Sequence, residues 1–345
     1  MSKIKSGSIL KIILPSLMTL FFIGNQIYSP KWTMYLQNII FDQYQNLSPR
    51  IDTEKSVFIV DIDDDSLEKL GQWPWPRFVL SNLIKILNDE YQVAAIGFDI
   101  LFSEKDRLSP LIVFEQLAKN NLNLSSEVIN TLEDFDKIFA DTIKEAQNIV
   151  LAISLNTKPN NNEYNEKASF SFLGGNPKNS LIKNYNLISN LNILTQKAKG
   201  QGFINSSTDI DGIVRKVPVI SNLTTFDNKT FIVPSFGSEL LRVAQNSNSY
   251  LIKSTKVRSK IIPLEIKNKN FIHKIDKEGN TRINFSNFNK NRLIPATEIL
   301  GKTYRNSLKN KIIIIGSSAS GLKDSVVTPL QSNIIGSEIH AQYIE

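Results

Sequence analysis

The chain has 345 residues, enough for one large or two medium domains, and its content of 41% hydrophobic and 21% charged residues indicates a globular protein. It contains no cysteine, which excludes disulfides, thiolate catalysis and cysteine-ligated zinc or iron–sulfur sites. The net charge is +7, but the lysines are scattered among acids and asparagines without a basic stripe, so we expect no nucleic-acid partner.

The first predicted element is a membrane-spanning helix. Lysines at positions 3, 5 and 11 precede an uncharged run, 12–30, that begins "IILPSLMTLFFIG" and as a helix approaches the roughly 30 Å of a bilayer's hydrocarbon core. The positive-inside rule places the N-terminus in the cytoplasm and the following chain outside it. A cleaved signal peptide is the rival interpretation, although no small-x-small cleavage site follows the run, and a buried core helix is the other alternative.

Three segments are expected along the chain. Residues 1–30 are the cytoplasmic N-terminus and transmembrane anchor, and 31–47 are a juxtamembrane helix, because their apolar residues recur at helical spacing. Residues 48–345 contain no internal repeat and no low-complexity linker, which favours one domain. The fold class we predict is α/β, a mixed sheet with flanking helices, preceded by one N-terminal transmembrane helix.

The first half of this domain predicts strands and helices in alternation. "SVFIVDID" (56–63) and "VAAIGFDILF" (93–102) are apolar strands, and the strand–helix–strand order predicts that they form a parallel pair with a right-handed crossover. A helical region, a third strand and a surface insertion follow at 110–147, 148–155 and 157–180. The connecting helix, 77–90, should turn one apolar face inward: Phe78, Leu80, Leu83, Ile84, Ile86 and Leu87.

The second half has antiparallel signals. Residues 200–220 predict a hairpin around Asp211-Gly212, and residues 271–285 predict another that turns at 278–280. A helix is expected at 233–245. The last strand, "KIIIIGSSASG" (311–321), runs into a glycine- and serine-rich loop, which lacks the adjacent Gly-Lys pair of a nucleotide-binding P-loop.

The acids after the first strand have two interpretations. Asp61 and Asp63 alternate along the strand end, where a pair of carboxylates can hold Mg²⁺ or act as in a haloacid-dehalogenase-like phosphatase, with Asp61 as nucleophile. That enzyme needs a later acidic pair, which the closing strand lacks. Helix capping is the favoured interpretation, with Asp64 or Asp65 preferred as the cap.

"GQWPWPR" (71–77) predicts a rigid turn, because each proline fixes its own φ and restricts the residue before it. Its tryptophans either line a pocket with Arg77 as an anion clamp or fill the core, with Arg77 paired to Asp61, Asp63 or Asp99. No catalytic residue, metal site or cofactor is expected. The candidate ligand-binding residues are Asp61, Asp63, Trp73, Trp75, Arg77 and Asp99.

These motifs together resemble the CHASE2 family. "VFIVDIDDDSLEKLGQWPWPRFVLSNLIKIL" with "AAIGFDILFSEKD" is similar to the start of that domain, and "GFINSSTDIDGIVRKVPVI" to its "DG.VR" hairpin. "VPSFGSELLRVA", "RINFSN" with "IPATEILG", and "KIIIIGSSASGLKDSVVTPLQSNIIGSEIHAQYIE" match its later segments, the last through its Gly, Asp, Thr-Pro, Gly and His-Ala positions. The likeness covers roughly residues 35–345.

The resemblance implies an extracytoplasmic sensory input module of a bacterial membrane receptor, without catalysis of its own. In the family architecture, further membrane helices and a nucleotide cyclase, histidine kinase or Ser/Thr kinase output follow the sensor, so this chain would be an input half. The resemblance implies the cell membrane as location, an unknown small molecule or stress as signal, and a homodimer as a possible assembly.

Overall fold

The computed structural model describes residues 6–28, 31–52, 55–118, 131–156, 162–206, 208–322 and 324–345. It divides into two compact units, Met1–Arg50 and Ile51–Glu345. The first unit, hereafter unit 1, contains helices α1 (Ser6–Tyr28) and α2 (Lys31–Leu47), where the sequence pattern predicts helices. Judged by length and hydropathy, none of the helices in these ranges could cross a membrane, so the predicted span over 12–30 is not found there.

The second unit, hereafter unit 2, is built on a seven-stranded sheet. The strand order is β15-β1-β16-β2-β3, and β7 and β6 each pair with β3 as well. All pairings are parallel except β3 with β6, so the prediction of a mixed sheet is confirmed. The strands are β1 Val57–Ile62, β2 Ala95–Phe98, β3 Ile149–Asn156, β6 Asn186–Ile188, β7 Gly200–Phe203, β15 Leu293–Pro295 and β16 Ile312–Ser317.

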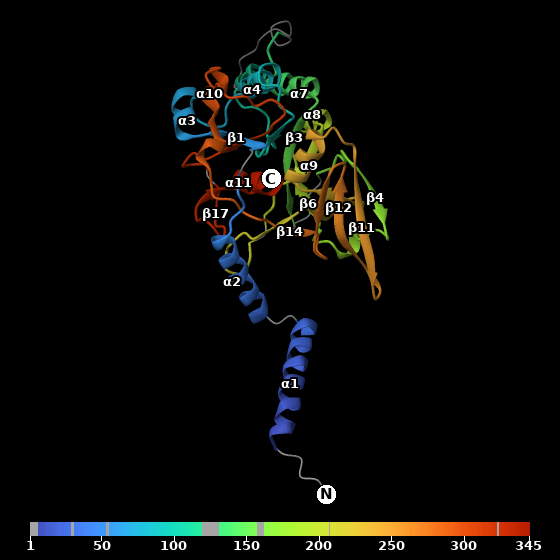
Figure 1. Cartoon of the computed structure of the whole chain (residues 1–345). Coiled ribbons are helices and arrows are strands. Elements are labelled where there is room, and N and C mark those ends of the chain that lie inside the picture. The colour runs from blue at the N-terminus through green and yellow to red at the C-terminus, as the bar shows by residue number, and fades with distance from the viewer. Residues whose placement is uncertain are drawn as a thin grey trace. The chain divides into compact units, whose positions relative to one another are not determined.

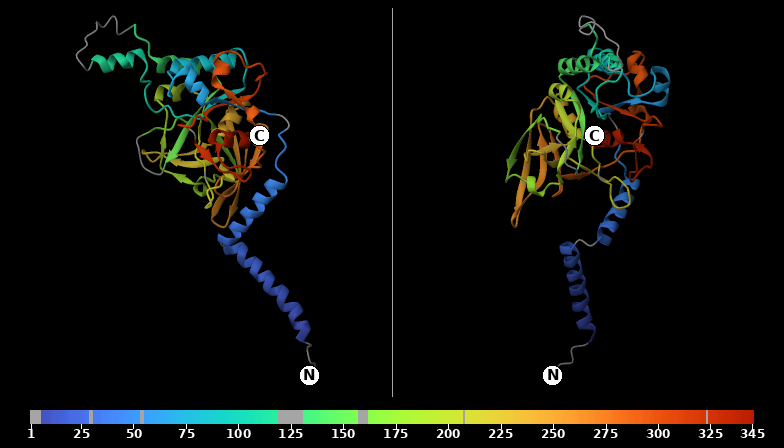
Figure 2. Two further views of the ribbon diagram at one scale, coloured as in Figure 1. Left: turned by 90° about the vertical axis from the view of Figure 1, so that its left-hand side faces the viewer. Right: turned by 180° about the vertical axis from the view of Figure 1, so that it is seen from behind.

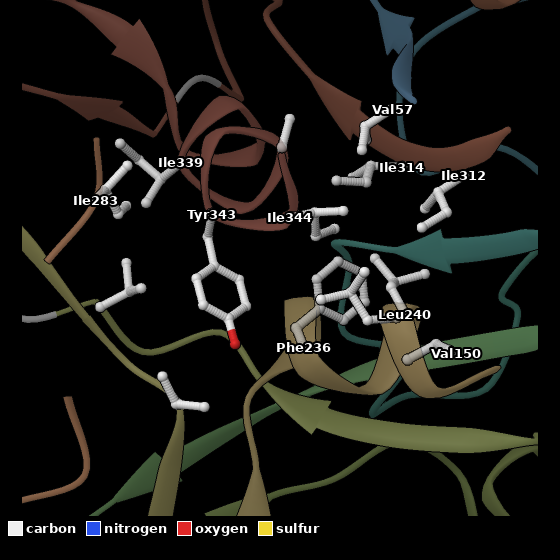
Figure 3. Close-up of a cluster of buried hydrophobic side chains, with 14 of the residues drawn as sticks. Val57, Val150, Phe236, Leu240, Ile283, Ile312, Ile314, Ile339, Tyr343 and Ile344 are labelled. Atoms are coloured by element: carbon white, nitrogen blue, oxygen red, sulfur yellow. The ribbon is translucent and has the colours of Figure 1, made fainter. Parts of the chain in front are cut away.

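Helices cover both faces of this sheet, because its apolar side chains alternate between two cores. Val57 and Ile59 of β1 pack toward α9 and α11, whereas Val60 and Ile62 pack toward α4, α7, α8 and α10. Figure 1 shows these two layers on opposite sides of the sheet, and Figure 3 shows the α9–α11 core. The helices are α3 Asp64–Leu70, α4 Arg77–Asp89, α5 Pro110–Ala118, α7 Phe135–Ala146, α8 Asn192–Lys197, α9 Phe236–Ala244, α10 Ala296–Leu300 and α11 Gly336–Ile344.

Two glycines let α9 lie unusually close to the sheet. A Cβ on Gly202 of β7 would meet the backbone of Phe236 at 2.5 Å, and one on Gly97 of β2 would meet the Phe236 ring at 2.6 Å. Such contacts are shorter than van der Waals packing permits, so any side chain here would force α9 outward. The start of α9 is therefore held over the carboxyl half of β7.

Smaller sheets flank the main one. The four-stranded sheet β13-β12-β11-β4 stands beside α9, on the side of unit 2 away from α3 and α10 (Figures 1 and 2). Its strands are β4 Ser169–Leu173, β11 Ser249–Val257, β12 Lys260–Asn268 and β13 Phe271–Lys274. The remaining pairings join β5 Lys183–Asn184, β9 Ile220–Thr224 and β10 Thr230–Pro234, then β8 Lys216–Pro218 with β14 Asn280–Arg282, and β17 Ser325–Val326 with β18 Ile334–Ile335.

Several predicted pairings are wrong, each because a distant segment pairs instead. The first two strands are parallel but not neighbours, since β16 lies between them. The turn at Asp211-Gly212 forms, yet its arms separate, β7 pairing β3 and β8 pairing β14. The predicted 271–285 hairpin likewise keeps its turn, while β13 pairs β12.

Two local predictions also need correction. The stretch predicted as a surface insertion, 157–180, contains β4, which pairs with β11; its first residues, 157–161, lie outside the described ranges. Phe78, expected on the inner face of α4, is 46% exposed and packs edge-on against Phe135 of α7 at 5.0 Å. The other five predicted inward residues of α4 are buried.

Candidate functional site

A cavity of about 400 Å³ opens at the carboxyl ends of the parallel strands. Ile62 ends β1, Ser317 ends β16, and Asp99 directly follows β2, and all three line it. Parallel strands end at one edge of their sheet, and this edge is where open α/β folds bind ligands. The opposite wall consists of the start of α9, the loop around Asp324 and the residues of α11 that face the sheet.

Asp99 and His340 form the polar centre of this cavity. One Asp99 carboxylate oxygen accepts a hydrogen bond from Ser337 Oγ at 2.6 Å, and the other lies 4.0 Å from His340 Nε2. The His340 ring packs edge-on against Phe236 at 5.2 Å. Burial lowers the pKa of His340, against the opposing pull of Asp99, so the imidazole is neutral at pH 7.

The predicted acidic cluster holds the glycine- and serine-rich loop. Asp61 is buried and accepts hydrogen bonds from Ser318 N at 2.8 Å and Ser318 Oγ at 2.6 Å; burial raises its pKa, although these bonds oppose the rise. Asp64 accepts two bonds from Ser320 in the same way. Capping by one aspartate is confirmed, but the cap is Asp63, which accepts from Ser66 N at 2.8 Å; the preference for Asp64 or Asp65 is wrong.

The two tryptophans of the turn have different environments. Trp75 is 1% exposed in the α4 core, and its indole N–H donates to Gly71 O at 2.8 Å. Trp73 is partly buried. Its ring packs edge-on against that of Trp75, with 5.6 Å between the centroids, and it lines the cavity. The core interpretation therefore holds for Trp75, whereas Trp73 and Asp99 are the predicted residues that the structure brings to the cavity.

Arg77 pairs with different acids from those expected. Its Nε lies 3.5 Å from Asp136, its Nη2 donates to Glu104 O at 3.3 Å, and its backbone N–H donates to Asp106. The guanidinium also covers the Phe102 ring at 4.5 Å. The predicted pairing with Asp61, Asp63 or Asp99 is wrong, because α7 brings Asp136 under the start of α4. Burial raises the pKa of Asp136, against its hydrogen bonds and Arg77.

Comparison with known protein families decides what kind of domain surrounds this cavity. The model of the CHASE2 domain matches residues 16–345. The chain belongs to the CHASE2 family. CHASE2 domains are extracytoplasmic sensors of membrane proteins and are typically non-catalytic. No curated protein and no solved structure matches the chain.

The CHASE2 hairpin motif is a buried ion pair here. Arg215, 2% exposed, binds Asp209 at 2.8 Å and Asp211 at 2.7 Å, which closes the turn on itself. The hydrogen bond from Arg215 lowers the pKa of Asp211. These ion pairs hold the turn closed, and Arg215 is not among the residues that line the cavity.

Sequence analysis missed most of the cavity. Asp324, Gly336 and His340 line the cavity and lie in the terminal CHASE2-like segment, at its Asp, Gly and His-Ala positions, but they are not among the predicted ligand-binding residues. The signal was thus present as family likeness. Nothing in the local pattern shows that α11 turns His340 toward Asp99, 241 positions earlier in the chain.

The two histidines should make the stability of the fold depend on pH, because burial lowers the pKa of each. Burial lowers the pKa of His273 and His340 below the ordinary 6.5, so on acidification the unfolded chain binds protons first. The free energy of unfolding should therefore fall between about pH 7.5 and pH 5.5, as urea midpoints at the two values would show. His340→Gln should reduce the fall and His273→Gln should reduce it separately. A wild-type midpoint that does not move contradicts the prediction.

Proposed function

We propose that this chain is the extracytoplasmic sensory input module of a membrane receptor and controls a cytoplasmic nucleotide cyclase, histidine kinase or Ser/Thr kinase. Membership of the CHASE2 family supports the sensory class. The phosphatase alternative gains no support, because the buried carboxylate of Asp61 is already bound to Ser318. The observation that carries the proposal is that one helix, α11, joins the cavity to both chain ends of unit 2.

The cavity side of α11 consists of Ser337, Ile339, His340 and Tyr343. Ser337 donates to Asp99, and the Tyr343 hydroxyl lies 2.8 Å from Ser238 Oγ at the start of α9. Figure 3 shows Ile339 and Tyr343 reaching from α11 into the shared core. An occupant of the cavity would therefore press directly on this helix.

The other side of α11 holds the two ends of unit 2 together. Arg292 is fully buried, and its Nη2 lies 2.6 Å from Glu345 and 3.4 Å from Asp52. Glu345 also accepts from the backbone N–H groups of Ser56 and Val57. Glu338 of α11 lies 3.7 Å from Arg292 Nε. We name Arg292, Asp52, Glu338 and Glu345 the end clamp.

The end clamp is only partly hydrogen-bonded, a state that suits a switch. Within the described residues, Arg292 Nε and Nη1 and Glu338 Oε2 are buried without hydrogen-bond partners. Burial raises the pKa of Glu338, which Arg292 opposes. A shift of α11 relative to Arg292 would give these buried groups a different set of contacts. Such a two-state element is what transmits a binding event.

Location at the cell membrane, with the N-terminus in the cytoplasm, is part of the proposal. The lysines near the N-terminus support the orientation. The large apolar side chains of α1 support contact of unit 1 with lipid, since they are 47–64% exposed: Ile13, Leu14, Leu17, Met18, Leu20, Phe21, Phe22 and Ile23.

A receptor chimera tests the proposal. Residues 1–345 would replace the input domain of a bacterial histidine kinase that drives a reporter gene. We expect Ser337→Ala, on the cavity side of α11, and Gln342→Met, on the Ser286 side, each to change output about fivefold or more, the lower range of allosteric coupling. Lys144→Ala, at an exposed position of α7, is the control. Unchanged output from both variants at normal protein levels would favour a structural ectodomain instead.

A further inference from the structure

The cavity lining is acidic, a feature that family membership does not explain. Its carboxylates are Asp99 and Asp324, and the residues described as lining it include no lysine or arginine. The remaining polar lining is neutral and consists of serine hydroxyls, one asparagine, a tyrosine and His340. Among the described residues the cavity has two carboxylates and no basic side chain, and such a lining attracts positive charge.

Asp99 and His340 lie close enough together for one donor beside them to reach both. The Asp99 oxygen that faces His340 accepts no hydrogen bond within the described residues, and neither does a His340 ring nitrogen. In the neutral tautomer that carries its proton on Nδ1, His340 Nε2 is an acceptor, and its 4.0 Å separation from this Asp99 oxygen lets one ammonium nitrogen donate to both. Asn205 is unlike them, because its side chain is occupied by both backbone groups of Leu155.

The rest of the lining suits an organic cation rather than a bare metal ion. Trp73 offers an aromatic ring, and rings of this kind attract cations through their faces. Ile62, Ile100 and Phe203 supply apolar surface for a carbon chain. No group of three or more metal-ligating side chains is found among the described residues. The volume falls within the range of small-molecule sites.

We propose that this cavity binds a small organic amine, with the ammonium group between Asp99 and His340 and the carbon body against Trp73 and the apolar wall. The inference rests on the proposed sensory function and specifies the ligand class. Asp324 at the rim then favours amines with a second positive charge. Binding would press on α11 next to Ser337, where the sensory path begins.

Calorimetric titration of the full chain with matched probes tests the ligand class. n-Butylamine, 1-butanol and butyrate share a carbon body and differ in head group, and 1,4-diaminobutane adds a second charge. We expect the affinity to decrease in the order 1,4-diaminobutane, n-butylamine, 1-butanol, butyrate. Asp99→Asn keeps an acceptor for Ser337 but removes the charge, and should weaken amine binding about tenfold or more. Asp324→Asn should reduce the difference in affinity between 1,4-diaminobutane and n-butylamine.

The controls separate this inference from the proposed function. Asp141→Asn, an exposed acid on α7, should leave amine binding unchanged. Butanol or butyrate binding as tightly as butylamine, or full amine affinity in Asp99→Asn, overturns the amine assignment even if the α11 variants alter output of the chimera. Amine binding that fails to change output, together with silent α11 variants, supports the ligand class and overturns the sensory role.

Discussion

Replacing Arg292 with methionine should be among the most destabilising single substitutions in this protein. The change leaves Asp52, Glu338 and Glu345 close together in the interior without their cation. Removing one partner of a buried ion pair typically costs about 3–5 kcal/mol, because the remaining charge has neither water nor a counter-ion. The free energy of unfolding from urea titration, measured at pH 7, should fall by about that amount.

Two companion variants, one at Arg292 and one at an exposed arginine, separate the effect of charge from that of shape and burial. Arg292→Lys keeps the charge but loses the planar guanidinium, whose Nη2 reaches Glu345 and Asp52 while its Nε faces Glu338, so we expect a smaller loss of stability. Arg107→Met removes an exposed arginine whose contact with Glu104 is 4.0 Å, and should cost at most about 1 kcal/mol. If Arg292→Met is no more harmful than Arg107→Met, the end clamp does not stabilise unit 2.

The end clamp also shows what the sequence could not predict. Arg292 stands in "NKNRLIP", which has the composition of a solvated loop, and its partner Asp52 is 240 positions away. Local patterns carry information on burial and helical phase, but none on which acid will meet a given arginine. Arg242 differs, because its partner Glu239 stands three positions before it on α9; only the full burial of this pair, in which Glu239 also accepts from Tyr250, goes beyond the local pattern. The predicted partners of Arg77 were wrong for the same reason, since its acid, Asp136, comes from α7.

What the sequence did predict rests on continuous apolar runs. β1, β3 and β16, and the helices α4 and α9, lie where their patterns indicate, since each pattern spans enough residues to fix its period. Strand order was beyond reach, because β16 inserts between β1 and β2 from more than two hundred positions later. Asp99 was predicted as a candidate ligand-binding residue, but its cavity partners come from α11, and so the site was predicted only in part.

Replacing Trp75 with alanine should destabilise unit 2 about as strongly as Arg292→Met. Trp75 is 1% exposed, packs in the core beneath α4, and satisfies its indole N–H within the turn at Gly71. Truncation of a buried tryptophan removes its apolar surface and leaves a cavity, at a typical cost of about 3–5 kcal/mol. The cost arises because Leu80 and Ile84, on the rigid helix behind it, cannot collapse into the space.

The other two tryptophans provide matched comparisons for this prediction. Trp32→Ala in unit 1 removes a side chain that is 47% exposed and should leave the unfolding of unit 2 unchanged. Trp73→Ala removes a partly buried ring, so we expect an intermediate loss of stability, together with weaker amine binding. Trp75→Ala should instead keep amine affinity in whatever fraction remains folded. Equal losses of stability for Trp73→Ala and Trp75→Ala would mean that both tryptophans belong to the hydrophobic core. The assignment of Trp73 to the cavity would then be wrong.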